Sequence, residues 1–193
     1  MQSIKMTESW ISVIMDYINK KVNEFKSADG HLYAIYGTPA ESLCEKQVEQ
    51  FRKKYGIVKD VSDHEYTTNS FHCCVRDDIT PIEKQDIEYP MYHLCTGGNI
   101  QYCRYPLQYN IDAIKTLVRR AMKLGFYEGV NLQLDFCPHC GTRFTDKDAC
   151  PKCGSEDIVR IERMNGYLSF SKIRGKSFFS DGKLKEFSER VSM

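Results

Sequence analysis

The chain has 193 residues, which is enough for one medium-sized domain with its own core, or for a domain with an appendage. The formal net charge of +1 gives no global electrostatic basis for binding nucleic acid or an anionic membrane, and 41% hydrophobic residues argue against disorder. An odd number of cysteines without a secretory signal, and no apolar run near the roughly 18 residues of a membrane span, favour a soluble, cytoplasmic protein.

The first third of the chain predicts a helix, a strand, a turn and a second helix. Apolar residues at helical spacing predict an amphipathic helix over residues 7–27, closed by Gly30. Strand formers at residues 31–36 predict a short strand, and GTPAES follows as a turn. A second helix should then end at Gly56, with Leu43, Val48 and Phe51 facing the core.

The turn between this strand and helix has the composition of an anion site. Thr38 can cap the helix, and Pro39 is suited to its first turn. Unpaired N–H groups and the helix dipole would then favour a phosphate. The alternative is a capped turn that binds no ligand.

The middle of the chain continues an α/β pattern. We expect a short strand at 69–75, an acidic helix at 81–89, a glycine turn at 94–99 and an extended segment at 100–105. His72, Cys73 and Cys74 resemble a metal cluster, but adjacent cysteines chelate one ion poorly, so we interpret them as buried filler.

A helix with a clear apolar face is expected after Asn110, which can cap it, and before Gly125, which can end it. Its inward face is expected to consist of Ile111, Ile114, Leu117, Val118, Ala121 and Met122. Three or four strands across 31–135 are too few to close a barrel.

Two Cys-x-x-Cys hooks, CPHC and CPKC, stand nine residues apart. The four thiols are Cys137, Cys140, Cys150 and Cys153. Each hook is followed by a glycine that lets the backbone turn, and two such hooks predict a closed, tetrahedral Zn²⁺ site of the structural kind. A thiol redox pair is the alternative. Such a ribbon could contact nucleic acid, although it has few clustered basic residues, or it could position whatever follows it.

The segment that follows reads RMNGYLS, and here the sequence resembles the anaerobic (class III) ribonucleoside-triphosphate reductases. In that family two Cys-x-x-Cys hooks bind zinc, and an Arg-x-x-Gly-Tyr-Leu segment carries a glycyl radical. The resemblance covers nearly the whole chain. Its other motifs are YGTPAES at 36–42, SFH at 70–72, LCTGG at 94–98 and the tail residues 182–183 and 189–191.

This resemblance implies a role for Gly166 as the radical site. A glycine radical is planar and delocalised over both neighbouring amide groups, and a side chain would twist that plane. The resemblance also implies that Tyr36 and Glu41 line the radical-transfer region. The substrate phosphate would then lie at the turn formed by Gly37, Thr38, Pro39, Ala40 and Ser42.

The sequence departs from the family at three places. Asn165 and Ser169 replace the usual Cys or Ser and the usual Gly beside the radical glycine, which could alter loop packing or recognition by the activating enzyme. Cys73 and Cys74 depart from the family's strand, and this weakens any catalytic role for that pair.

The implied fold is α/β: the last βα units of a ten-stranded barrel at 1–132, a zinc ribbon at 133–160, and the radical loop and tail at 161–193. The implied cofactors are Zn²⁺ and a glycyl radical, which a radical-SAM activase generates with a [4Fe–4S] cluster and S-adenosylmethionine. The implied partners are that activase, a ribonucleoside triphosphate, and a larger chain with the thiyl cysteine and the allosteric site. We expect no nucleic acid and no membrane.

Three origins of such a short chain remain open: a subunit of a split reductase, a spare part that replaces an oxygen-cleaved terminus, or a truncation. A zinc-ribbon binding module without chemistry is the competing function. The reductant, allosteric rules, oligomeric state and roles of the other five cysteines also stay open; these are Cys44, Cys73, Cys74, Cys95 and Cys103.

Overall fold

The structure is a computed structural model that describes residues 2–38, 43–68, 71–104, 110–131, 134–145, 147–163, 168–173, 176 and 179–191. Its helices are α1 (Gln2–Asp29), α2 (Cys44–Tyr55), α3 (Pro81–Tyr92), α4 (Ile111–Lys123) and α5 (Asp181–Ser188). Its strands are β1 (Ile100–Arg104), β2 (Tyr127–Asn131), β3 (Leu134–Phe136), β4 (Arg143–Phe144), β5 (Val159–Arg163) and β6 (Leu168–Ile173).

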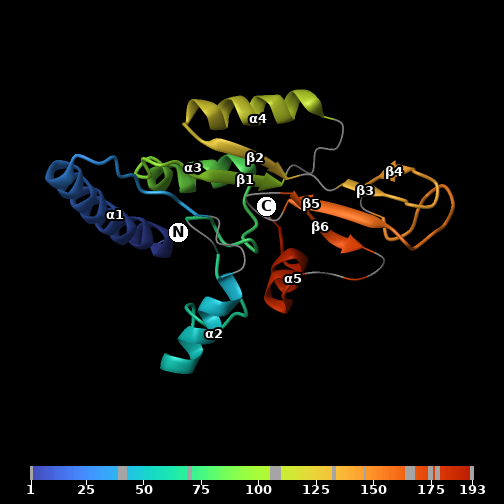
Figure 1. The fold of residues 1–193 in the computed structure, drawn as a ribbon, viewed down its shortest axis with the longest axis horizontal. Helices are drawn as coiled ribbons and strands as arrows, with labels where there is room; N and C mark the ends of the chain where they lie inside the picture. Colours follow the sequence, from blue (N-terminus) through green and yellow to red (C-terminus); the bar gives the residue numbers. More distant parts are fainter. Residues whose placement is uncertain are drawn as a thin grey trace.

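A parallel layer occupies one part of the molecule (Figure 1). β1 and β2 pair in parallel from Ile100↔Tyr127 onward, and the chain between them forms α4, as a parallel crossover requires. α4 packs on β2, α3 contacts both β1 and α4, and α1 contacts α3. The core of this layer contains Tyr92 and Phe126, whose rings meet edge to face with centroids 4.9 Å apart.

A four-stranded antiparallel sheet in the order β4-β3-β5-β6 lies beside this layer (Figure 1). β5 is the long inner strand, and it pairs with β3 through Phe136↔Val159 and with β6 through Arg163↔Leu168. A register shift at Arg160/Ile161 interrupts the second pairing. The sheet therefore connects the region of the cysteine hooks with the C-terminal strands.

α2 and α5 pack against each other below these two parts (Figure 1). Gly182 of α5 allows close approach, because an added Cβ would lie 2.9 Å from the Cβ of Glu45. The Tyr66 hydroxyl donates to Glu189 at 2.5 Å, and the Val191 N–H donates to the Val75 carbonyl at 2.7 Å. α5 was not predicted from the sequence, although Ser180, whose Oγ accepts from the Lys183 N–H, is a recognisable cap.

The predicted helices form, with corrected bounds. α1 begins at Gln2 rather than at residue 7 and runs two residues beyond 27 before Gly30 at φ 75°, and α3 continues through Pro90 to Tyr92. α2 begins at Cys44, so Thr38 does not cap it within the described residues. Leu43 is 46% exposed and does not face the core as predicted, whereas Val48 is buried.

α4 begins and ends as the sequence indicates. The Asn110 side chain accepts from the Ala113 N–H at 3.1 Å, and Gly125 has a φ of 83°. The predicted inward face is too broad, because Ile111 and Met122 are exposed while Ala121 is buried. The other predicted positions, Ile114, Leu117 and Val118, are half-buried.

Two predicted strands are wrong. Residues 31–36 form no strand, Leu32 is 97% exposed, and pairing is limited to a single bridge from Gly37 to Asn99. Residues 71–75, the described part of the segment 69–75, also form no strand. Both segments have the composition of strands but lack a neighbouring strand in the described part of the chain, and a strand requires one.

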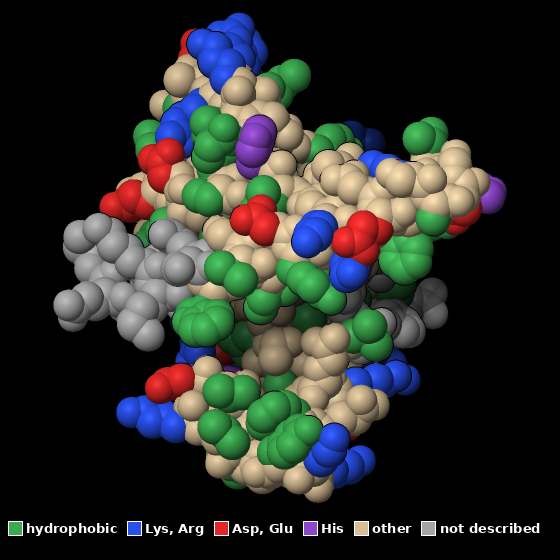
Figure 2. All heavy atoms as spheres, turned by 90° about the vertical axis from the view of Figure 1, so that its left-hand side faces the viewer, with side chains coloured by type: hydrophobic (Ala, Val, Ile, Leu, Met, Phe, Trp, Pro, Cys, Tyr) green, Lys and Arg blue, Asp and Glu red, His purple; other side chains and the backbone are tan. Residues whose placement is uncertain are grey.

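Two further features, the character of the helices and the exposed side chains around α1, bear on function. No helix in the described ranges has the length and apolar character needed to cross a bilayer. Figure 2 shows the side of the molecule that α1 occupies, where hydrophobic side chains lie exposed among charged ones.

Candidate functional site

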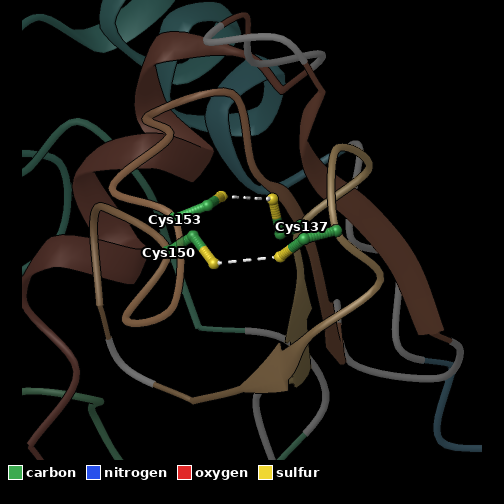
Figure 3. A group of neighbouring side chains, drawn as sticks. Cys137, Cys150 and Cys153 are labelled. Carbon is green, nitrogen blue, oxygen red and sulfur yellow. Dashed lines mark hydrogen bonds between the residues drawn. The ribbon is translucent and has the colours of Figure 1, made fainter.

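The sulfur atoms of Cys137, Cys140, Cys150 and Cys153 lie within 4.8 Å of one another. Across the hooks, Cys137 Sγ lies 3.6 Å from Cys153 Sγ, and Cys140 Sγ lies 3.5 Å from Cys150 Sγ (Figure 3). A disulfide would bring two sulfurs to about 2 Å, whereas a tetrahedral zinc with bonds of about 2.3 Å separates them by roughly 3.8 Å. The donor set and spacing therefore fit a zinc ion.

The two hooks have the same backbone geometry. In each, the N–H of the first cysteine donates to the carbonyl five residues on, and the glycine N–H donates back to the first cysteine's carbonyl. These bonds measure 2.9 and 2.8 Å in the first hook and 2.8 and 2.9 Å in the second. Gly141 and Gly154 have φ values of 69° and 71°, a region that glycine enters without cost, as the sequence predicted.

The surroundings of the sulfurs favour thiolates at some positions. A hydrogen bond between Cys140 Sγ and Thr142 Oγ1, 3.2 Å apart, stabilises the thiolate and lowers the pKa of Cys140 to about 6. The Lys152 N–H points at Cys150 Sγ from 3.4 Å. Thiolate is the form that binds metal.

The hooks lie at the ends of paired strands. Cys137 directly follows β3, and the second hook precedes β5, which pairs with β3. The buried carboxylate of Asp135 on β3 accepts two hydrogen bonds from Arg160 on β5, at 2.9 and 3.3 Å. Arg160 also donates to the Lys147 carbonyl between the hooks at 3.0 Å. This bidentate ion pair fixes the cysteine region to the sheet.

Gly166 belongs to residues 164–167 and lies outside the described residues. The chain enters this segment from Arg163 at the end of β5 and leaves it at Leu168, the start of β6. Arg163 and Leu168 are cross-strand partners, so the two ends of the segment are held together.

Two motif turns that are distant in sequence lie side by side. The Gly37 N–H donates to the Gly98 carbonyl at 3.2 Å, and the Gly97 N–H donates to the Ile35 carbonyl at 2.7 Å. An added Cβ on Gly97 would lie 2.8 Å from the Ile35 oxygen, so only glycine permits this approach. The sequence interpretation of the glycine pair as a tight turn missed this contact.

The predicted substrate turn is described only in part. Tyr36 is 55% exposed beside this junction, and Thr38 is exposed as well. The remaining predicted residues lie outside the described residues; these are Pro39, Ala40, Glu41 and Ser42.

A buried polar cluster in the parallel layer was not predicted. Glu88 of α3 accepts from Lys84, one turn earlier, and from the Cys73 N–H at 2.9 Å. His72 lies 3.4 Å from Glu88, and its ring nitrogen lies 2.9 Å from the Tyr92 hydroxyl. The sequence offered one signal, a Lys and a Glu at i and i+4 in a helix.

His72 is buried as predicted, but it takes part in a hydrogen-bonded cluster rather than serving as inert filler. Cys73 and Cys74 are only partly buried, so the interpretation of this pair as buried filler is wrong in its degree of burial. Burial raises the pKa of Cys73 to about 12, which leaves it a protonated thiol.

Comparison with known proteins identifies the family. The family model for anaerobic ribonucleoside-triphosphate reductase matches residues 2–193, and the chain belongs to this family. It is 35% identical to the anaerobic ribonucleoside-triphosphate reductase of enterobacteria phage T4, over 92% of this chain and 30% of that protein. With the Escherichia coli K12 enzyme it shares 34% identity, over 92% of this chain and 26% of that protein.

Solved structures show the same fold. An anaerobic ribonucleotide reductase matches 95% of this chain with a TM-score of 0.75 and 17% sequence identity, and 28% of that chain is covered. The reductase from Thermotoga maritima in complex with dATP and CTP matches with a TM-score of 0.64 and 16% identity. The chain thus spans about a quarter to a third of the length of the relatives it matches.

Proposed function

We propose that this chain is the radical-bearing C-terminal part of an anaerobic ribonucleotide reductase, which converts ribonucleoside triphosphates to 2′-deoxyribonucleoside triphosphates. The observation that carries the proposal is the position of the four-cysteine cluster, which lies in the chain between the paired strands β3 and β5. β5 leads directly to the segment that contains Gly166, and the reductase family matches the whole span.

In this proposal the zinc holds the base of a loop. Cys137, Cys140, Cys150 and Cys153 bind Zn²⁺ in a closed shell of four thiolates, which leaves no position for water or substrate. Because the zinc joins the two hooks, it also fixes the register in which β5 pairs with β3. The loop at 164–167 is thereby directed toward a barrel that other parts of the reductase complete.

Gly166 is the proposed radical site. A radical-SAM activase, with its [4Fe–4S] cluster and S-adenosylmethionine, removes one hydrogen atom from the Gly166 Cα. Gly166 then takes a hydrogen atom from a cysteine S–H in another part of the reductase, and the thiyl radical takes the ribose 3′ hydrogen. The 2′ hydroxyl leaves as water, and formate or a thiol system supplies the two electrons. This chain contributes placement and the exclusion of oxygen.

Substrate is proposed to bind at the turn that begins with Tyr36. The described residues Ile35 and Gly37 lie against the Gly97–Gly98 turn, and this contact supports a fixed backbone at that place. The phosphates would contact residues 37–40 and 42, with Tyr36 and Glu41 near the path of the radical. The Thermotoga reductase of the same fold was solved in complex with dATP and CTP, which agrees with a nucleotide-binding role.

The proposed division of the chain is the end of the α/β barrel at 1–132, the zinc ribbon at 133–160, and the radical loop and tail at 161–193. The relatives' greater length supports a larger partner region that supplies the thiyl cysteine and the allosteric site. The protein is proposed to act in the cytoplasm.

Electron paramagnetic resonance tests this function. The chain is combined anaerobically with the polypeptide that carries the rest of the reductase, the activase, S-adenosylmethionine and a reductant. We expect a glycine doublet that disappears in Gly166→Ala and persists in Gly30→Ala, a glycine after α1 that lies outside both the cysteine hooks and the proposed radical segment. A doublet in Gly166→Ala, or none in the native chain, would overturn the assignment.

Exposure to air gives a second readout. Oxygen should cut the activated chain at Gly166 and release a short C-terminal peptide, seen by mass spectrometry. Rescue of a full-length, oxygen-cleaved reductase by this chain would instead identify a spare part. Zinc binding with neither radical nor cleavage would support the non-catalytic binding module.

A further inference from the structure

Helix α1 bears apolar side chains on two opposite faces. Its inner face packs toward α3: Met15 is 3% exposed, and Asn19 Nδ2 donates to the Leu94 carbonyl at 3.0 Å. Its outer face, defined here as Trp10, Val13, Ile14 and Tyr17, is exposed by 68, 59, 55 and 61%. The spacings of three and four residues place these four side chains on one side of the helix.

A helix at the surface of a complete domain presents one apolar stripe to the core and polar residues to water. The outer face of α1 breaks this pattern with four large apolar side chains in two turns. Clusters of this kind mark a surface that another protein segment covers.

The parallel layer that contains α1 is also incomplete. β1 and β2 form a parallel sheet of two strands in the described residues. Parallel sheets are found buried and built of more strands, and a pair alone is marginal. The outer face and the open sheet thus belong to the same unfinished layer.

We propose that the outer face of α1 is a docking surface for the part of the reductase that this chain does not match, which would present a complementary apolar surface. This inference rests on the proposed function. The family match begins at residue 2, so α1 lies inside the reductase fold. The matched fold covers 28% of a solved reductase chain, which leaves most of that protein available to cover the face.

Trp10 is the one tryptophan in the sequence and belongs to this surface, of whose four residues it is the most exposed. The chain is labelled with 5-fluorotryptophan, and the unlabelled polypeptide from the same source that carries the rest of the reductase is added. A single ¹⁹F resonance should shift and broaden on binding. Tryptophan is also the side chain most often found at the energetic centre of an interface.

The matched variants are Ile14→Glu and Asn23→Glu. Each adds one negative charge to an exposed position of α1, but only the first lies in the outer face. Ile14→Glu should raise the dissociation constant at least about tenfold, and Asn23→Glu should change it by less than about twofold. Circular dichroism of each free variant confirms that α1 still folds.

Four outcomes would overturn the docking surface. Two concern the complex: an unchanged ¹⁹F resonance of Trp10 when it forms, and equal effects of the two variants on the dissociation constant. The other two are the absence from the source of a polypeptide that carries the rest of the reductase, and self-association of the free chain through this face. Light scattering detects self-association, which Ile14→Glu would abolish in that case. If the Ile14→Glu variant binds with undiminished affinity and its complex still gives a glycine doublet, this inference alone is overturned. Docking as expected, with no doublet, overturns the radical function instead.

Discussion

At the scale of single residues, the parallel layer holds charges that water does not reach. Lys84 and Glu88 are buried beside the ring of His72, and Glu88 also accepts the backbone N–H of Cys73. Although burial alone would raise the pKa of Glu88, the Lys84 ammonium and the hydrogen bonds from His72 and Lys84 hold it at about 2. A buried ion pair adds little over a hydrophobic pair, but breaking one half of it is costly, because the other charge stays behind.

Lys84→Met should therefore lower the free energy of unfolding by about 3–5 kcal/mol, since it leaves the Glu88 carboxylate buried without its cation. Adding Glu88→Gln removes that charge while its amide oxygen still accepts from the Cys73 N–H, so the double variant should recover part of the loss. Urea denaturation followed by circular dichroism measures both. A double variant that is as unstable as Lys84→Met would contradict this account.

Stability should fall in acid because of His72. Burial lowers its pKa in the folded state, so the folded protein holds the ring neutral while the unfolded chain protonates near pH 6.5. A depressed folded pKa gives stability that is present above the unfolded pKa and is lost as pH falls below it. Stability should therefore fall as pH drops below about 6.5, and the slope due to this one group cannot exceed about 1.4 kcal/mol per pH unit.

The control for this effect is His72→Gln, which removes the titrating ring. Its unfolding free energy should depend less on pH between about 6.5 and 5, and the difference between the two curves isolates His72 from the zinc ligands. Below about pH 4.5 both proteins should lose further stability, because Glu88 protonates there in the unfolded chain but keeps its charge in the folded protein down to about pH 2. Parallel curves over the whole range would show that His72 does not couple to folding.

At the scale of elements, the proposed substrate turn depends on the Thr96–Asn99 turn. Gly97 places its N–H 2.7 Å from the Ile35 carbonyl, and the Thr96 hydroxyl accepts from the Ile35 N–H at 3.4 Å. The segment 31–38 forms no strand of its own, so these contacts, with the Gly37 to Asn99 bridge, determine where it lies.

Gly97→Ala should displace residues 35–38, because its Cβ would lie 2.8 Å from a backbone oxygen that cannot rotate away. Hydrogen exchange of this segment should accelerate, with a stability loss of about 1–3 kcal/mol. Gly98→Ala is the comparison: φ is 87° and no atom lies within 4 Å of an added Cβ, so it costs about 1–2 kcal/mol of backbone strain without pushing on Ile35. Equal exchange in both variants would refute the steric explanation.

At the scale of the whole molecule, the more extensive contacts between described helices and strands fall into three groups, and the buried cluster of Cys44, Tyr66, Val75 and Tyr102 links the first two. One contains α1, α3, α4, β1 and β2, another contains α2 and α5, and the third is the sheet of β3 to β6. The cysteine cluster belongs to the third group alone. Removing metal should therefore unfold one group and leave the others.

Chelation of zinc, or Cys140→Ser, should abolish the protection of residues 134–163 from hydrogen exchange while α4 and β2 keep theirs. The reason is that metal binding supplies much of the folding free energy of such small ribbons. Cys74→Ala, which changes a thiol outside the cluster, should keep one zinc per chain by elemental analysis. Loss of protection throughout the chain would mean that the three groups fold as one.

Short-range features were predictable from sequence because their chemistry lies within a few residues. The hooks turn at Gly141 and Gly154, α4 starts at the cap of Asn110, and Gly56 follows α2 with a φ of 78°. Each depends on a side chain reaching its own backbone, or on a positive φ that only glycine adopts readily. The four-thiol metal site follows from the same local logic.

Only the tertiary structure decided which distant segments meet. Residues 31–36 have strand composition and form no strand, since a strand exists only through its neighbour. The contact of Gly97 with Ile35 and the burial of Glu88 beside His72 join positions that no local pattern relates, and only the fold shows that the outer face of α1 stays exposed. Burial and pairing are properties of the assembled chain, and no short segment of the sequence determines them by itself.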